Sequence, residues 1–135
     1  MSCAASFSNI EGMAVQPQGI PIIRSKLHRP PVAADIVHRS ALLARLDEGR
    51  DLPLSLASAP AGYGKSTLVS QWLESSGSPS AWLSLDETDS DLRVFVSYVV
   101  AAVRTVSPTA CQDTLAQLDS DELPPTETLA GLLSN

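Results

Sequence analysis

The apolar residues of this chain follow the two spacings that are typical of strands and of helices. Every second residue of 52–57 is a leucine, which predicts a short strand. Residues 65–74 then carry apolar side chains three and four positions apart, which predicts a helix. The same two patterns recur as a strand over 81–85 and a helix over 91–105. This order predicts an α/β fold with a parallel sheet flanked by helices.

The remaining segments complete a coarse plan of the chain. Residues 1–20 are small, polar and aperiodic, so they are expected to form a flexible N-terminal extension before a domain over 21–135. Leucines at helical spacing predict a helix over 39–46, which Gly49 can end. A last helix is expected over 127–133. Few strands can be recognised, so the predicted sheet is incomplete.

The charge of the chain is acidic and unevenly spread. The 9 basic and 15 acidic residues give a net charge of −6. Residues 1–50 carry six basic and four acidic side chains, or +2, whereas residues 51–135 carry three and eleven, or −8. Neutralising DNA phosphates requires a surplus of Lys and Arg. The chain by itself is therefore predicted not to bind DNA directly.

The hydrophobic segments are too short for a membrane protein. The longest apolar run covers only 98–103, far less than a bilayer requires. The first residues lack the cationic start and the apolar block of a secretory signal. Cys3 and Cys111 have neither disulfide-framework nor zinc-site spacing. A cytoplasmic protein without a membrane partner is expected.

Residues 59–66, between the first predicted strand and the helix after it, match most of the phosphate-binding pattern Gly-x-x-x-x-Gly-Lys-Ser/Thr. Ala59 replaces the first glycine, and the last three residues of the pattern are intact. Gly62 and Gly64 can adopt backbone conformations closed to other residues, so successive N–H groups can turn inward around an anion. A helix beginning at Lys65 adds the partial positive charge of its N-terminus. The alternative is a tight turn with no ligand.

Each side chain at the end of this pattern has its own chemical role. Lys65 would reach the terminal phosphates as a point charge, and the Ser66 hydroxyl would ligate Mg²⁺. Thr67 adds a backbone N–H. The expected nucleotide contacts in and after the loop are Pro60, Ala61, Gly62, Tyr63, Gly64, Lys65, Ser66 and Thr67.

Hydrolysis would also require a carboxylate at the end of an apolar strand, to hold the magnesium water shell. Asp86 and Glu87 follow the predicted strand 81–85, but Asp86 comes only 20 residues after Ser66. A strand end with a helix cap is the other interpretation of these acids. No later predicted strand ends in Asp. The chain therefore shows no complete hydrolysis apparatus, and whether it is an enzyme stays open.

Both histidines and one arginine precede the loop. His28 and His38 have no partners at metal-ligand spacing, so surface positions are expected. Arg39 lies about twenty residues before the loop, in a segment that can fold back over the base and ribose of a nucleotide. A solvated arginine at a helix start explains the spacing equally well.

Several segments, taken in order, resemble the N-terminal part of the MalT-like, ATP-dependent LuxR-type transcriptional regulators. The resemblance covers about residues 20–135. Its specificity comes from two segments taken together, the Ala-Pro-Ala-Gly-Tyr-Gly-Lys-Ser loop and Trp82 to Glu87. The matching segments are Lys26 to Pro30, Val37-x-Arg39-x-x-Leu42, 59–66, Gln71-Trp72, and Trp82 to Asp89 through Phe95-x-x-Tyr98.

This resemblance implies a signal-transduction ATPase (STAND) module with a P-loop NTPase-type parallel sheet. ADP or ATP with Mg²⁺ would sit on the loop, and nucleotide exchange with an inducer would switch a monomer to an oligomer. Val37 and Arg39 would contribute to the nucleotide pocket. Asp86 would be a motif position, because in the family the magnesium carboxylate ends a later strand, before which this chain stops. The chain is accordingly expected to be a fragment.

Three functions follow from these observations. The first is a regulatory ATP/ADP-binding module whose partners are the nucleotide, the remainder of a parent regulator and, in that parent, a second copy. The second is a small P-loop kinase or ATPase that uses Asp86 or Glu87. The third is an inactive truncated product, since an unfinished sheet leaves an unpaired edge.

Overall fold

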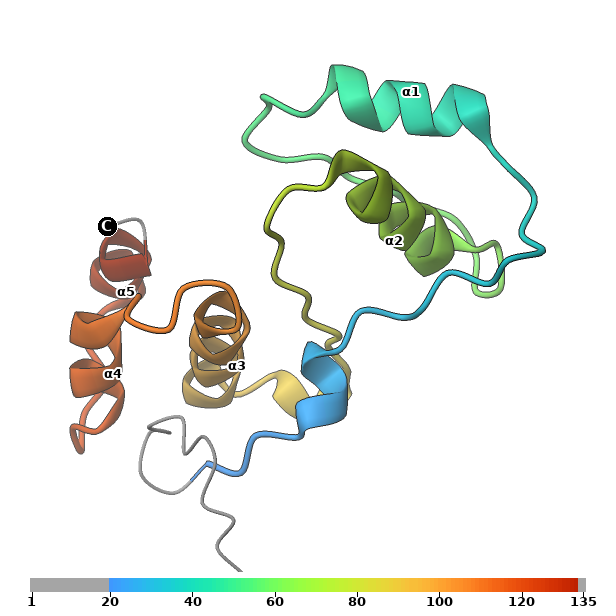
Figure 1. Cartoon of the computed structure of the whole chain (residues 1–135). Coiled ribbons are helices and arrows are strands. Elements are labelled where there is room, and N and C mark those ends of the chain that lie inside the picture. The colour runs from blue at the N-terminus through green and yellow to red at the C-terminus, as the bar shows by residue number, and fades with distance from the viewer. Residues whose placement is uncertain (1–19, 134–135) are drawn as a thin grey trace, which may run out of the picture. The chain divides into compact units, whose positions relative to one another are not determined.

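The computed structural model describes residues 20–133, and their regular structure is helical (Figure 1). The extension expected over 1–20 lies outside the described residues, apart from residue 20. The described part divides into two compact units, one of residues 23–87 and one of residues 20–22 with 88–133. In chain order the elements are η1 (Arg24–Leu27), α1 (Ser40–Glu48), α2 (Lys65–Ser76), η2 (Glu87–Asp89), α3 (Leu92–Arg104), α4 (Gln112–Leu118) and α5 (Thr126–Leu133).

The predicted α/β fold with a P-loop-type parallel sheet is wrong. Residues 20–133 contain no strand, and both 52–57 and 81–85 lack regular secondary structure. A strand persists only where a neighbouring strand pairs its backbone groups and other elements cover one face. The leucines of 52–57 have no such cover: Leu54 is 79% exposed and Leu56 is 88% exposed. Pro53 in addition has no N–H to donate.

The helix predictions are confirmed for α1, α2, α3 and α5, within about two residues at each end. Residues with special backbone roles fix several of these ends. Gly77 ends α2 in the left-handed region at φ 63°. Asp91 caps α3, because its Oδ1 accepts a hydrogen bond from the Val94 backbone N–H at 3.0 Å. The sequence prediction missed α4, since it gave no helix between the predicted helices 91–105 and 127–133.

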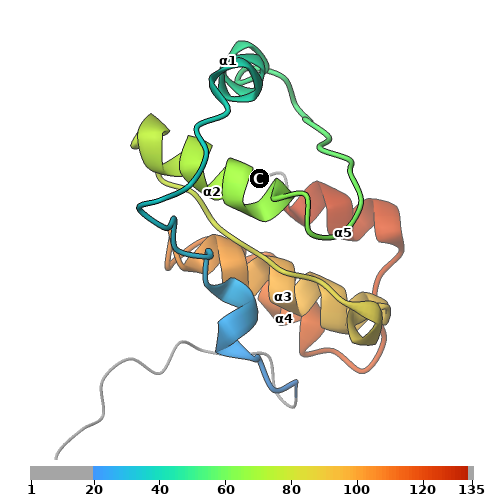
Figure 2. The same cartoon turned by 90° about the vertical axis from the view of Figure 1, so that its right-hand side faces the viewer.

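In the unit of residues 23–87, α1 and α2 are in contact (Figures 1 and 2). Asp47, near the end of α1, accepts a hydrogen bond from the Trp72 indole N–H on α2 at 3.3 Å. Arg50 donates to the same carboxylate at 2.6 Å and lies 5.9 Å from the centre of the Trp72 ring. Elsewhere in this unit Lys26 forms an ion pair with Asp86 at 2.9 Å, and the Ser84 backbone N–H donates to the Lys26 carbonyl.

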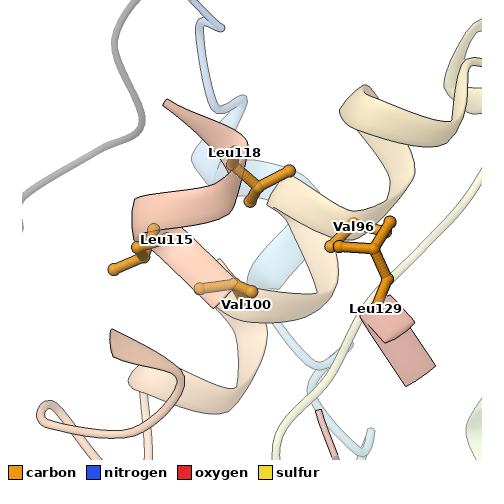
Figure 3. Packing of buried hydrophobic residues seen from close by; sticks show 5 residues of the cluster. All are labelled: Val96, Val100, Leu115, Leu118 and Leu129. Carbon is orange, nitrogen blue, oxygen red and sulfur yellow. The ribbon is translucent and has the colours of Figure 1, made fainter. Parts of the chain in front are cut away.

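The other unit has a small core to which α3, α4 and α5 each contribute. Five buried side chains form this core and are shown in Figure 3, with Val96 and Val100 on α3 and Leu129 on α5. Leu115 and Leu118 come from α4. Burial of a leucine or valine side chain contributes about 1.5–3 kcal/mol to the stability of the folded unit.

None of the helices within 20–133 is long and apolar enough to cross a bilayer.

Candidate functional site

The loop 59–66 has the backbone geometry that its glycines suggest. Gly62 and Gly64 adopt φ values of 82° and 74°, in the left-handed region. A Cβ at Gly62 would meet no atom within 4 Å, so the backbone conformation, and not crowding, favours glycine there. The helix α2 begins immediately afterwards at Lys65, and the Leu68 N–H donates to the Gly64 carbonyl at 2.9 Å. The loop therefore lies at the positive end of a twelve-residue helix.

Lys65 folds back over the start of the loop. Its ammonium donates to the Ala59 carbonyl at 2.7 Å and to the Pro60 carbonyl at 3.0 Å. Both acceptors are neutral backbone oxygens, and a hydrogen bond with a charged partner of opposite sign is stronger. A phosphate at the loop can therefore compete for this ammonium.

Arg39 reaches the loop from a distant part of the sequence. Its guanidinium donates to the Tyr63 carbonyl at 2.9 Å, across 24 positions of sequence. It also packs against Gly64, where a Cβ would lie 3.7 Å from Arg39 Nη2. Arg39 is exposed and directly precedes α1, as expected of a solvated arginine at a helix start, and its side chain also contacts the loop.

A cavity of about 200 Å³ lies beside the loop, between the segment around Val37 and one face of α2. Val37 is 80% exposed although it lines this cavity. The lining residues are Ile36, Val37, Arg39, Gly64, Thr67, Leu68 and Gln71. The structure thus brings together the two upstream residues singled out by the resemblance and the end of the predicted phosphate loop.

Another cavity, of about 600 Å³, lies between α1, the segment 52–59 and the start of α2. Its walls include leucines of α1 and of 52–57, and its cationic side chains are Arg39, Arg45 and Lys65. Positive charge therefore surrounds the loop from α1 as well as from α2, an arrangement that attracts anions.

The remaining predicted contacts are accessible. Pro60, Ala61 and Tyr63 are exposed on the loop, and Ser66 and Thr67 are exposed on the first turn of α2. Within 20–133 no group of three or more His, Cys, Asp or Glu side chains is placed to hold a metal ion. A magnesium ion at this loop would draw on the Ser66 hydroxyl and on phosphate oxygens.

The acids after the second predicted strand have structural contacts. Asp86 forms the ion pair with Lys26, and Glu87 begins η2. The capping role belongs to Asp91, five residues further on. The His28 Nδ1–H donates to the Arg24 carbonyl at 2.7 Å, four positions earlier in the sequence.

Sequence reasoning gave no site role to one residue of this region, Gln71, which entered only as part of the segment Gln71-Trp72. Its side chain is buried, lines the smaller cavity, and places Nε2 3.1 Å from Nδ1 of His38. A glutamine on a helix is usually exposed, and its partner lies 33 positions away, so no local pattern indicates this contact.

Comparison with known proteins gives no family assignment. No protein-family model matches the chain, and no solved structure matches it.

Proposed function

We propose that this chain is a cytoplasmic regulatory module that binds ATP or ADP, of the kind found at the N-terminus of MalT-like LuxR-type transcriptional regulators. The observation that carries the proposal is the loop 59–66 at the start of α2, with Gly62 and Gly64 in left-handed conformations and Arg39 bound to the Tyr63 carbonyl. The N-terminus of α2 and the two cations Arg39 and Lys65 lie together there, and a helix N-terminus with nearby cations is the chemistry that binds phosphate.

In this proposal the nucleotide lies along α2. Its phosphates take the Lys65 ammonium from the carbonyls of Ala59 and Pro60, and Ser66 ligates the accompanying Mg²⁺. The base and ribose occupy the adjoining cavity beside Val37 and Arg39, so that the ligand covers the exposed valine.

The role is regulatory in our proposal, not that of a kinase. Of the two carboxylates that a small kinase would use, Asp86 is paired with Lys26 and Glu87 begins η2. The bound nucleotide would instead act as a switch for self-association in a larger regulator.

Calorimetric titration of the full chain with Mg-ATP and Mg-ADP tests this proposal. Lys65→Ala should weaken nucleotide binding at least about tenfold, because a charge-assisted contact with phosphate is lost. Arg24→Ala removes one exposed cation outside the loop and should leave affinity unchanged, as a matched control. Circular dichroism of both variants checks that the helices persist. Equal affinity of Lys65→Ala and the unmodified chain would show that the loop is only a turn.

A further inference from the structure

The smaller cavity is bounded by a segment that is attached to α2 on both sides of it. At one side Arg39 donates to the Tyr63 carbonyl, just before α2 begins. At the other side His38 meets Gln71, with Gln71 Nε2 3.1 Å from Nδ1 and 3.3 Å from Nε2 of the imidazole. Between these attachments the cavity is walled by apolar side chains of Ile36, Val37 and Leu68.

Gln71 is an unusual residue for this position. The apolar residues of α2 predict a face of Leu68, Val69, Trp72 and Leu73, yet these are only half-buried while Gln71 is 9% exposed. A buried carboxamide is costly unless its groups are hydrogen-bonded. The imidazole of His38 takes one amide hydrogen, and the amide oxygen keeps its capacity to accept.

We propose that Gln71, oriented by His38, is the residue that selects the base of the bound nucleotide in favour of adenine. This inference rests on the proposed nucleotide site. With its amide nitrogen held at His38 through one hydrogen, the carboxamide is fixed in one orientation, and its carbonyl oxygen is the acceptor that it offers to the base. Adenine carries an amino donor on its six-membered ring where guanine carries a carbonyl oxygen. The adenine amino group can donate to the Gln71 carbonyl oxygen. The guanine carbonyl oxygen would instead place a second acceptor against it.

The placement along α2 suits this role. Gly64, Thr67, Leu68 and Gln71 recur at helical spacing and line the same cavity, so they share one face of the helix. Gln71 lies seven residues after Gly64, a rise of about 10.5 Å along the helix. A nucleotide extended along this face therefore has its phosphates at the loop and its base at Gln71.

The experiment compares the affinities of the full chain for Mg-ATP, Mg-GTP and inorganic triphosphate by calorimetry. The unmodified chain should prefer ATP to GTP by about tenfold or more. Gln71→Leu should bring the ATP-to-GTP affinity ratio close to one and leave triphosphate affinity unchanged. His38→Phe, which removes the acceptor that orients Gln71, should lower the same ratio. Gln117→Leu makes the identical chemical change at an exposed position of α4 and should change nothing.

The outcomes separate this inference from the proposal beneath it. If the unmodified chain binds none of the three ligands, both the nucleotide site and the role of Gln71 are wrong. If it binds nucleotides but Gln71→Leu keeps the ATP-to-GTP ratio, only the role of Gln71 is wrong. Gln71→Met, with an unbranched side chain of similar length, provides the same comparison if the leucine variant fails to fold.

Discussion

Asp47 shows how one exposed carboxylate can join two helices. It accepts hydrogen bonds from Arg50 at 2.6 Å and from the Trp72 indole at 3.3 Å, and so connects the end of α1 to α2. The hydrogen bond from Arg50, then that from Trp72 and the nearby Arg50 charge, lower the pKa of Asp47. Both donors favour the ionised carboxylate, so protonation weakens this link.

The lowered pKa of Asp47 sets the direction of a pH effect. Because the folded-state pKa lies below the ordinary aspartate value of about 3.9, the link is complete above that pH and is lost as pH falls through the lower folded value. Trp72 fluorescence, recorded in a Trp82→Phe background, should therefore change as the pH falls below about 4. In Asp47→Asn this acid transition should disappear. If the acid transition persists unchanged in Asp47→Asn, it is due to the protonation of another group.

The residues of the candidate site differ in how well the sequence alone could predict that they belong to it. Lys65 and the two loop glycines belong to a local pattern, and the chemistry of phosphate binding explains that pattern without a structure. Arg39 was suggested by resemblance, because spacing alone allowed a solvated arginine. Gln71 occurs in a segment that carries the resemblance but received no role from it, and its contact is with a histidine 33 positions away.

At the scale of elements, four of the helices were predicted correctly, and the predicted sheet was wrong for residues 20–133. A helix satisfies its hydrogen bonds within one segment, so the apolar spacing together with Gly77 or the Asp91 cap is enough to place it. A strand requires a neighbour, and alternating leucines over 52–57 do not supply one. The missed α4 begins after Cys111, a non-glycine residue in the left-handed region at φ 58°. Contacts with α3 and α5 accompany that helix, and its own sequence does not reveal them.

Arg93 attaches α3 to the end of α4. Its guanidinium donates to the carbonyls of Leu118, Ser120 and Asp121, where a helix ends and its last carbonyls need partners. A cation there also complements the helix dipole.

We predict that Arg93→Met destabilises the chain by about 1–3 kcal/mol, because several partly buried carbonyls lose a charged donor. Urea unfolding followed by circular dichroism measures this change. Arg93→Lys should recover only part of the loss, since an ammonium cannot span carbonyls as a planar guanidinium does. Arg104→Met, at the other end of α3, is the matched control. Unchanged stability of Arg93→Met would mean that these contacts contribute nothing net.

For the whole molecule, the charge divides between the two units. Residues 23–87 carry seven basic and seven acidic side chains, which sum to zero. Residues 88–133 carry two basic and seven acidic side chains, a net of −5, and Glu11 completes the total of −6. The unit that contains the loop 59–66 is therefore neutral overall, and the cations of the larger cavity beside that loop are Arg39, Arg45 and Lys65.

This distribution leads to a last prediction, that the chain alone does not bind DNA. Affinity for duplex DNA depends on neutralising several phosphates at once, and neither a neutral unit nor an acidic one presents the required surplus of cations. Three cations around one cavity suit a single nucleotide better than a run of backbone phosphates. Fluorescence anisotropy with a labelled duplex at physiological salt should show no saturable binding up to tens of micromolar, the range of non-specific affinities. Low-micromolar binding that weakens steeply with salt would contradict this. In that case Arg45→Ala would show whether the cations of the larger cavity form the contact surface.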